Sequence, residues 1–154
     1  MHIPSDPAVR RFIRKSSVVR TAAVSPAGNP DIIPLYFVMW RGRIYMSIRS
    51  ANPIARDIMR SGETALLFHA ERGRSGGRAL RVRGSARFRT DRRTVRLIAL
   101  LSARKYFLSP GGAWNVVQNR GKLGLRGRYV GERAGEGGVV EVVPATAEFL
   151  RLPG

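Results

Sequence analysis

Cysteine is absent from all 154 residues, and histidine occurs only twice. The lack of cysteine excludes disulfides, thiolate metal sites and thiol nucleophiles. His2 lies near the terminus and His69 in an apolar stretch, which is too little histidine for a typical zinc site or a well-supplied Ser-His-Asp triad. We therefore predict no metal site and interpret His69 as a hydrogen-bonded structural residue.

Acidic residues are also scarce, with ten Asp and Glu against 28 Lys and Arg. The ten carboxylates are scattered along the chain and suggest no paired acid and base. No phosphate-binding loop of the GxxxxGK[ST] type and no dinucleotide fingerprint follows a strand. We therefore predict no catalytic side chain, so that an enzymatic activity would need a cofactor to carry the reactivity.

No run of eighteen apolar residues occurs, and the first residues, MHIPSDPAVRR, lack the apolar segment of a signal peptide. We expect no membrane span, and we expect the protein to be cytoplasmic. The chain length and a hydrophobic content of 44% predict one folded domain over residues 1–154.

The formal net charge of +18 favours an anionic partner, which could be nucleic acid, a phosphorylated ligand or an anionic membrane. Only Lys15, Lys105 and Lys122 are lysines, so the other 25 basic residues are arginines. This skew fits coding bias in a GC-rich genome, and it also fits selection for bidentate anion binding.

Apolar spacing and turn formers predict a mostly β chain with few helices. We expect strands over residues 18–24, 31–40, 43–49, 64–70 and 79–89, with one or two closing strands over residues 139–151. Helices are expected after Asp6-Pro7, over residues 53–60, and from Asp91 to Tyr106. In the last of these helices, we expect Val95, Ile98, Ala99 and Leu101 to face inward. The Gly-rich residues 110–138 carry no clear pattern apart from a short helix near residues 114–119.

The stretch ALRVRGSARFR at residues 79–89 alternates apolar and basic residues with period two. One face of the strand carries Leu80 and Val82 towards the core, and the other carries a row of arginines. That row is a solvated outer face, a surface for a ligand tail or subunit, or a nucleic-acid site. Because no aromatic side chain stands among the arginines for base stacking, we expect nucleic acid to bind only non-specifically.

The run from Val18 to Phe68 resembles the pyridoxamine 5'-phosphate oxidase-like flavin-binding split barrels. The resemblance lies in the order of a strand, a Gly-x-Pro turn, a strand with a central proline, a hairpin, a strand ending in serine, and a short helix. LRVRGSARF resembles a later family strand, and EVVPATAEFLR resembles the terminal strands. In the run from Val18 to Phe68, the resemblance rests on Gly28, Pro30, Pro34, Gly42 and the strand Tyr45–Ser50.

The resemblance implies a split β-barrel of about six to eight antiparallel strands, which forms a homodimer with two cofactor clefts at its interface. The cofactor would be FMN or the deazaflavin coenzyme F420, and the reaction a hydride transfer with a small-molecule redox substrate. The alternatives are a basic nucleic-acid-binding barrel without catalysis, and a cofactor carrier or vestigial barrel.

The resemblance also implies a set of cofactor-binding residues. Strand residues 33–36 would form a wall beside the ring, and polar and basic residues of the third strand and the next helix would hold the phosphate. The sequence departs from the family pattern at Ile54, where lysine is frequent, and at Ile48, where threonine is common. Trp114 would cover the cleft from the partner subunit or pack in the core. The predicted set is Ile33, Pro34, Leu35, Tyr36, Ser47, Ile48, Arg49, Ser50, Arg56 and Trp114.

Overall fold

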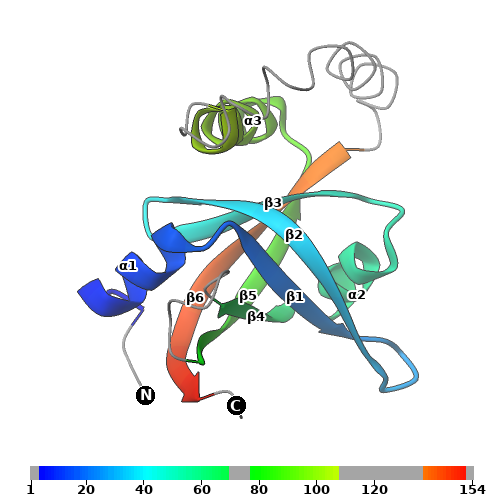
Figure 1. Cartoon of the computed structure of the whole chain (residues 1–154). Coiled ribbons are helices and arrows are strands. Elements are labelled where there is room, and N and C mark those ends of the chain that lie inside the picture. The colour runs from blue at the N-terminus through cyan, green and yellow to red at the C-terminus, as the bar shows by residue number, and fades with distance from the viewer. Residues whose placement is uncertain (1–3, 70–76, 108–136, 152–154) are drawn as a thin grey trace, which may run out of the picture.

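The computed structural model describes residues 4–69, 77–107 and 137–151. Six strands form one closed barrel in the order β1-β2-β3-β6-β5-β4, and every neighbouring pair is antiparallel (Figure 1). The chain is a mostly β split barrel, as predicted. The strands are β1 (Val18–Val24), β2 (Pro30–Trp40), β3 (Arg43–Arg49), β4 (Glu63–His69), β5 (Arg78–Arg89) and β6 (Gly137–Arg151).

Local chemistry sets the two hairpins that begin the barrel. Between β1 and β2, the turn is closed by the backbone hydrogen bond from Gly28 N–H to Ser25 O, and Gly28 has a φ of 84°. Between β2 and β3, Arg41 and Gly42 both have positive φ, which suits the twist of a two-residue hairpin. These turns fix the register of β1, β2 and β3.

Two helices pack against the barrel core. Helix α1 (Pro7–Lys15) begins at Asp6, whose carboxylate accepts the Ala8 N–H, and it buries Val9 and Ile13. Helix α2 (Pro53–Ser61) begins at Asn52, buries Ile54 and Ile58, and ends at Gly62. Their buried side chains belong to the same cluster as those of the strands, so both helices complete the barrel interior.

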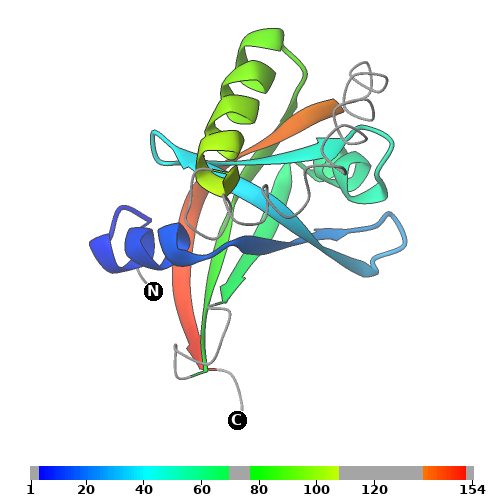
Figure 2. The same ribbon diagram turned by 45° about the horizontal axis from the view of Figure 1, so that its top comes forward.

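The third helix, α3 (Arg92–Phe107), lies outside the barrel, on the side of β2 and β3 (Figures 1 and 2). Its Ile98 is fully buried and packs with Val38, Tyr45 and Val139 in a small second cluster, against which Val95 and Leu101 also pack. The inward face was predicted to include Ala99 as well. That prediction was wrong, because Ala99 lies on the exposed side of the helix.

The chain closes with one long strand. β6 pairs with β5 along the whole length of β5, with a register shift at Arg83 and Gly84. At this shift Gly84 lies against the backbone of Val143, and a Cβ on Gly84 would stand 2.1 Å from the Val143 carbonyl oxygen. The glycine thus permits a β-bulge at which β6 bends. Among the described residues, no helix is long and apolar enough to cross a membrane.

Candidate functional site in the gap between β2 and β3

The β2–β3 hairpin is paired over only part of its length. Its ladder runs from Trp40 opposite Arg43 to Phe37 opposite Met46. Beyond that pair, residues 30–36 of β2 pair with β1 alone, and residues 47–49 of β3 pair with β6 alone. The two strands of one hairpin therefore separate into different parts of the barrel, which leaves a gap in the β2–β3 ladder.

Eight of the ten predicted cofactor-binding residues lie on the two edges of this gap. Residues 33–36 form the β2 edge, and residues 47–50 follow the last β3 residue that pairs with β2. If the register continued, Tyr36 would stand opposite Ser47 and Ile33 opposite Ser50. The two groups of strand residues that the family resemblance implies thus lie on the two sides of this gap.

The side chains on the β2 edge alternate between the barrel interior and its outer surface. Ile33 and Leu35 pack against the main core cluster. Pro34 and Tyr36 are exposed, and Tyr36 has 66% of its surface accessible. Pro34 and Tyr36 can therefore offer their side chains to a ligand on the outer surface, whereas Ile33 and Leu35 support the edge from within.

The β3 edge has the same alternation. Ser47 and Arg49 are exposed, whereas Ile48 is a buried core residue. A contact of Ile48 with a ligand would therefore involve its backbone. Ser50 lies at the turn before α2, where Asn52 N–H donates to Arg49 O at 3.0 Å. The outer surface of this edge is thus polar and basic.

Helix α2 begins directly after the β3 edge. Its first turn contains no acidic residue, so the positive end of the helix dipole is not offset there. Arg56 is exposed in this turn, and neither Arg49 nor Arg56 forms an ion pair with a described residue. Ile54, where lysine was the family expectation, is buried in the core. Arg49 and Arg56 are therefore two exposed cationic side chains near the gap.

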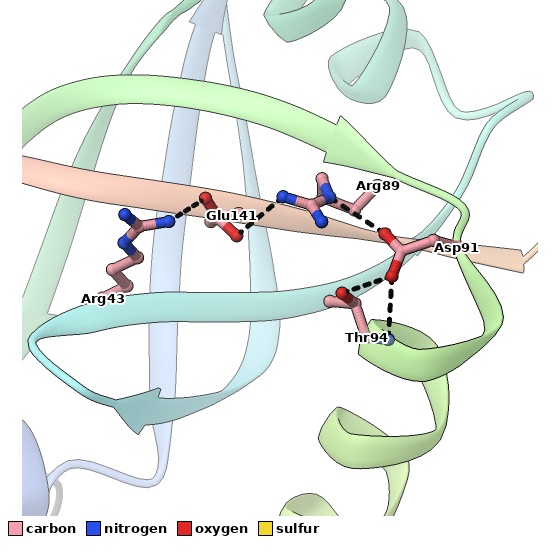
Figure 3. Close-up of polar contacts among 5 residues, drawn as sticks. All are labelled: Arg43, Arg89, Asp91, Thr94 and Glu141. Atoms are coloured by element: carbon pink, nitrogen blue, oxygen red, sulfur yellow. Dashed lines mark hydrogen bonds and ion pairs between the residues drawn. The ribbon is translucent and has the colours of Figure 1, made fainter.

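A polar network fixes the other end of the β2–β3 hairpin and the start of α3 (Figure 3). Glu141 of β6 is buried between Arg43, which donates to it at 2.6 Å, and Arg89, at 3.5 Å. Arg89 also donates to Asp91 at 2.9 Å, and Asp91 accepts both the hydroxyl and the backbone N–H of Thr94. The network joins β3, β6, β5 and α3.

Two ionisation equilibria are shifted in this network. Hydrogen bonds from the Thr94 hydroxyl and N–H, together with Arg89, hold the pKa of Asp91 well below its ordinary value. Burial, with help from the neighbouring Glu141 carboxylate, raises the pKa of the Tyr45 hydroxyl above 10. Asp91 is thus an anionic helix cap and Tyr45 a neutral hydroxyl near neutral pH. Neither of these two groups lies at the gap.

The arginine-rich stretch at residues 79–89 lies in β5, and the predicted alternation of inward apolar and outward basic side chains is confirmed. Leu80, Val82 and Ala86 are buried in the core. On the outer face, Arg81 pairs with Glu148, and Arg89 pairs with Asp91 and Glu141. Arg83 and Arg87 are exposed. Part of the arginine row therefore neutralises carboxylates of neighbouring segments.

His69, at the end of β4, lies 2.7 Å through Nδ1 from the Arg20 guanidinium, which agrees with the predicted hydrogen-bonded role. Trp114 lies outside the described residues. Within the described part of the chain, no group of three or more histidine, aspartate or glutamate side chains could hold a metal ion.

The sequence reasoning missed the residues that hold β2 at the gap. Lys105 and Tyr106, near the end of α3, contact the backbone of Phe37, which is the last β2 residue paired with β3. The only available signal was that Lys105 is one of three lysines in an arginine-rich chain.

The six antiparallel strands close into a barrel, and its β2–β3 hairpin is paired over only part of its length. This architecture is that of the split β-barrel proteins. The sequence model that describes the pyridoxamine 5'-phosphate oxidase family matches residues 5–115 of this chain. The chain belongs to this family. No curated protein matches the sequence.

Solved structures agree in fold. Conserved hypothetical protein Rv2991 from Mycobacterium tuberculosis superposes with a TM-score of 0.73 at 13% identity, covering 97% of this chain and 89% of that one. An F420 reductase gives 0.63 at 14% identity, covering 90% and 94%. A protein related to general stress protein 26, of the pyridoxinephosphate oxidase family, from Clostridium acetobutylicum gives 0.62 at 11% identity, covering 94% and 86%. At these identities the similarity concerns the fold.

Proposed function

We propose that this protein binds a flavin-type cofactor at the gap between β2 and β3 and uses it for hydride transfer with a small molecule. One observation carries the proposal: residues 33–36 and 47–50 form the two edges of the gap in the β2–β3 ladder, and neither Arg49 nor Arg56 beside it forms an ion pair with another described residue. The family supports a flavin, and the F420 reductase among the similar structures supports a deazaflavin as the alternative.

The residues at the gap suit such a cofactor. The Arg49 and Arg56 guanidiniums and the Ser47 hydroxyl can bind a phosphate through charge-assisted hydrogen bonds. The exposed Tyr36 ring and Pro34 offer a flat, apolar wall for a tricyclic ring system. The bound cofactor would supply the hydride chemistry, and the chain would bind and orient it. A side-chain acid or base is not required.

A homodimer is part of the same proposal. On the outer face of β1 and β2, Val24, Ile32 and Tyr36 have 51%, 61% and 66% of their surfaces exposed. These exposed apolar side chains are spread along one face, and a second copy of the chain is the cover that we propose for this face; it would also close the cofactor site. Light scattering should give a dimer for the wild type and a monomer for Ile32→Lys; a monomeric wild type at micromolar concentration would contradict this.

Specific nucleic-acid binding is the rival function. The pairing of Arg81 and Arg89 with carboxylates reduces the free charge of the β5 row. We therefore expect duplex DNA to bind without sequence preference, with a dissociation constant of roughly 10⁻⁴–10⁻⁶ M at physiological salt.

The test is an absorption and fluorescence titration of the purified protein with FMN and with F420, alongside DNA duplexes of several sequences at fixed salt. Saturable binding of one cofactor supports the proposal. Nanomolar, sequence-dependent DNA binding without cofactor binding would favour the rival. Cofactor binding without turnover of any redox substrate would favour a carrier or vestigial barrel.

A further inference from the structure

The gap at β2 is held by side chains from a distant part of the sequence. The β1–β2 ladder ends at Val18 opposite Tyr36, and the β2–β3 ladder ends at Phe37 opposite Met46. Along β2, the ladder with β1 therefore ends at Tyr36, and the ladder with β3 ends at the next residue, Phe37. A strand segment at such a point is stabilised by fewer backbone hydrogen bonds than the strand interior.

The Tyr106 hydroxyl bridges this point. It accepts the Phe37 N–H at 3.1 Å, and it lies 2.9 Å from Phe37 O and 2.7 Å from Ser17 O, to either of which it can donate. Ser17 directly precedes β1. One hydroxyl thus connects the backbone of β2 with the chain segment that enters β1, just past the last paired residues.

The Lys105 ammonium group makes a second bridge across the same two segments. Nζ donates to Phe37 O at 3.0 Å and to Ser16 O at 3.3 Å, and it lies 3.5 Å from the centre of the Phe37 ring. Among the described residues no carboxylate pairs with Lys105. Its donors are therefore directed at backbone carbonyls of β2 and the β1 entry.

The Tyr106 ring also contacts the exposed side chain of Tyr36 on the β2 edge of the gap. Its centre lies 4.8 Å from that of the Tyr36 ring, in an edge-to-face arrangement at 65°. Aromatic pairs of this geometry are attractive beyond the area that they bury. Tyr36 is otherwise largely exposed, so this contact restricts its ring on the outer surface.

We infer that Tyr106 and Lys105 are positioning residues, which hold the Tyr36–Phe37 segment of β2 and thereby orient the Tyr36 ring towards a ligand in the gap. The inference rests on the proposed function, because it assigns the ligand as the flavin-type cofactor. Neither residue needs to contact the cofactor. They act through Tyr36 and through the backbone of Phe37.

The experiment compares Tyr106→Phe, which keeps the ring but removes the hydroxyl, and Lys105→Met with the wild type. Arg104→Gln, on the exposed side of α3, is the matched control. Three properties are measured: amide hydrogen exchange in the cofactor-free protein, affinity for FMN and F420, and the visible circular dichroism of the bound cofactor, which reports its orientation. Thermal melting shows that each variant is folded at the measuring temperature.

In Tyr106→Phe, the Phe37 amide should exchange at least about tenfold faster, because it loses its hydroxyl acceptor. Cofactor affinity should fall by roughly tenfold in both variants, and the visible circular dichroism of the bound cofactor should change. The control should match the wild type in all three measurements. A loss of thermal stability alone, with unchanged affinity and unchanged circular dichroism, would overturn the inference, since a merely structural role predicts that result.

Two further outcomes separate this inference from the proposed function. If the wild type binds a cofactor and the Phe37 amide exchanges equally in wild type and Tyr106→Phe, the bridge is wrong while the proposed function stands. If the wild type binds neither FMN nor F420, the proposed function is wrong and the orienting role towards a cofactor is wrong with it; faster exchange at Phe37 would then support the bridge alone.

Discussion

Glu141 and Arg43 form an ion pair at 2.6 Å in which the carboxylate is buried and the guanidinium is about half exposed. Glu141 lies in an otherwise apolar stretch of β6, and its second oxygen faces Arg89 at 3.5 Å. Removing the charge would leave two cations close together without their common partner.

We expect Glu141→Gln to lower the free energy of unfolding by about 1–3 kcal/mol, in the range for hydrogen bonds to charged groups. Glu148→Gln is the matched control, because the Arg81–Glu148 pair is partly exposed on both sides and should contribute less than about 1 kcal/mol. Urea unfolding measures both. Equal losses in the two variants would show that the burial of Glu141 has no energetic consequence.

The bulge between β5 and β6 makes a second prediction. Gly84→Ala should destabilise the fold by roughly 1–3 kcal/mol, because the added Cβ meets backbone atoms of Val143 that cannot rotate away. Gly137→Ala is the control, since nothing lies within 4 Å of a Cβ at that position. Thermal melting of both variants is the measurement, and a Gly84→Ala protein as stable as the control would exclude the close approach.

Lys105 predicts a dependence of stability on pH. Burial lowers its pKa from 10.5 to about 8. Between these values the unfolded chain binds the Lys105 proton and the folded chain does not, so this group makes the free energy of unfolding rise with pH. The raised pKa of Tyr45 acts in the opposite direction only near pH 10 and above.

Relative to Lys105→Met, the wild type should therefore gain stability between about pH 8 and pH 10 in urea unfolding. Lys15→Met removes an exposed lysine of α1 and should give a curve parallel to that of the wild type. A wild-type stability that falls against Lys105→Met over this range would contradict the burial of the ammonium group.

The phosphate end of the proposed site can be tested with two exposed arginines. Arg49→Ala and Arg56→Ala should each weaken FMN binding by about ten- to a hundredfold through the loss of a charge-assisted hydrogen bond. Arg10→Ala, on the exposed side of α1, controls for the overall loss of positive charge. If all three titration curves coincide with that of the wild type, the phosphate is bound elsewhere.

Most of the barrel could be predicted from the sequence, because alternation and turn chemistry are local. Residues 18–24 and 43–49 were predicted as strands with the bounds of β1 and β3, and the helix expected over residues 53–60 extends by one residue to Ser61. β6 was expected as one or two strands, and the bulge at Gly84 explains how a single strand bends there.

The gap and its supports could not be predicted from local patterns. The separation of β2 from β3 depends on which other strands each one pairs with. The bridge from α3 to Phe37 joins residues 68 and 69 positions apart. Similarly, the error at Ala99 arose because α3 is apolar on both sides, with Leu100 exposed, and so does not reveal which face meets the barrel.

The central claim is that a flavin-type cofactor binds between the edges of β2 and β3, and chemical-shift mapping by NMR tests it most directly. Isotope-labelled protein is titrated with FMN and with F420, and the backbone amide shifts are followed. If the cofactor binds there, the largest shifts should fall on both edges together, at the amides of Ile33, Leu35, Tyr36 and residues 47–50, and at Arg56. Shifts confined to the β5 arginines, or no shifts with either cofactor, would contradict it.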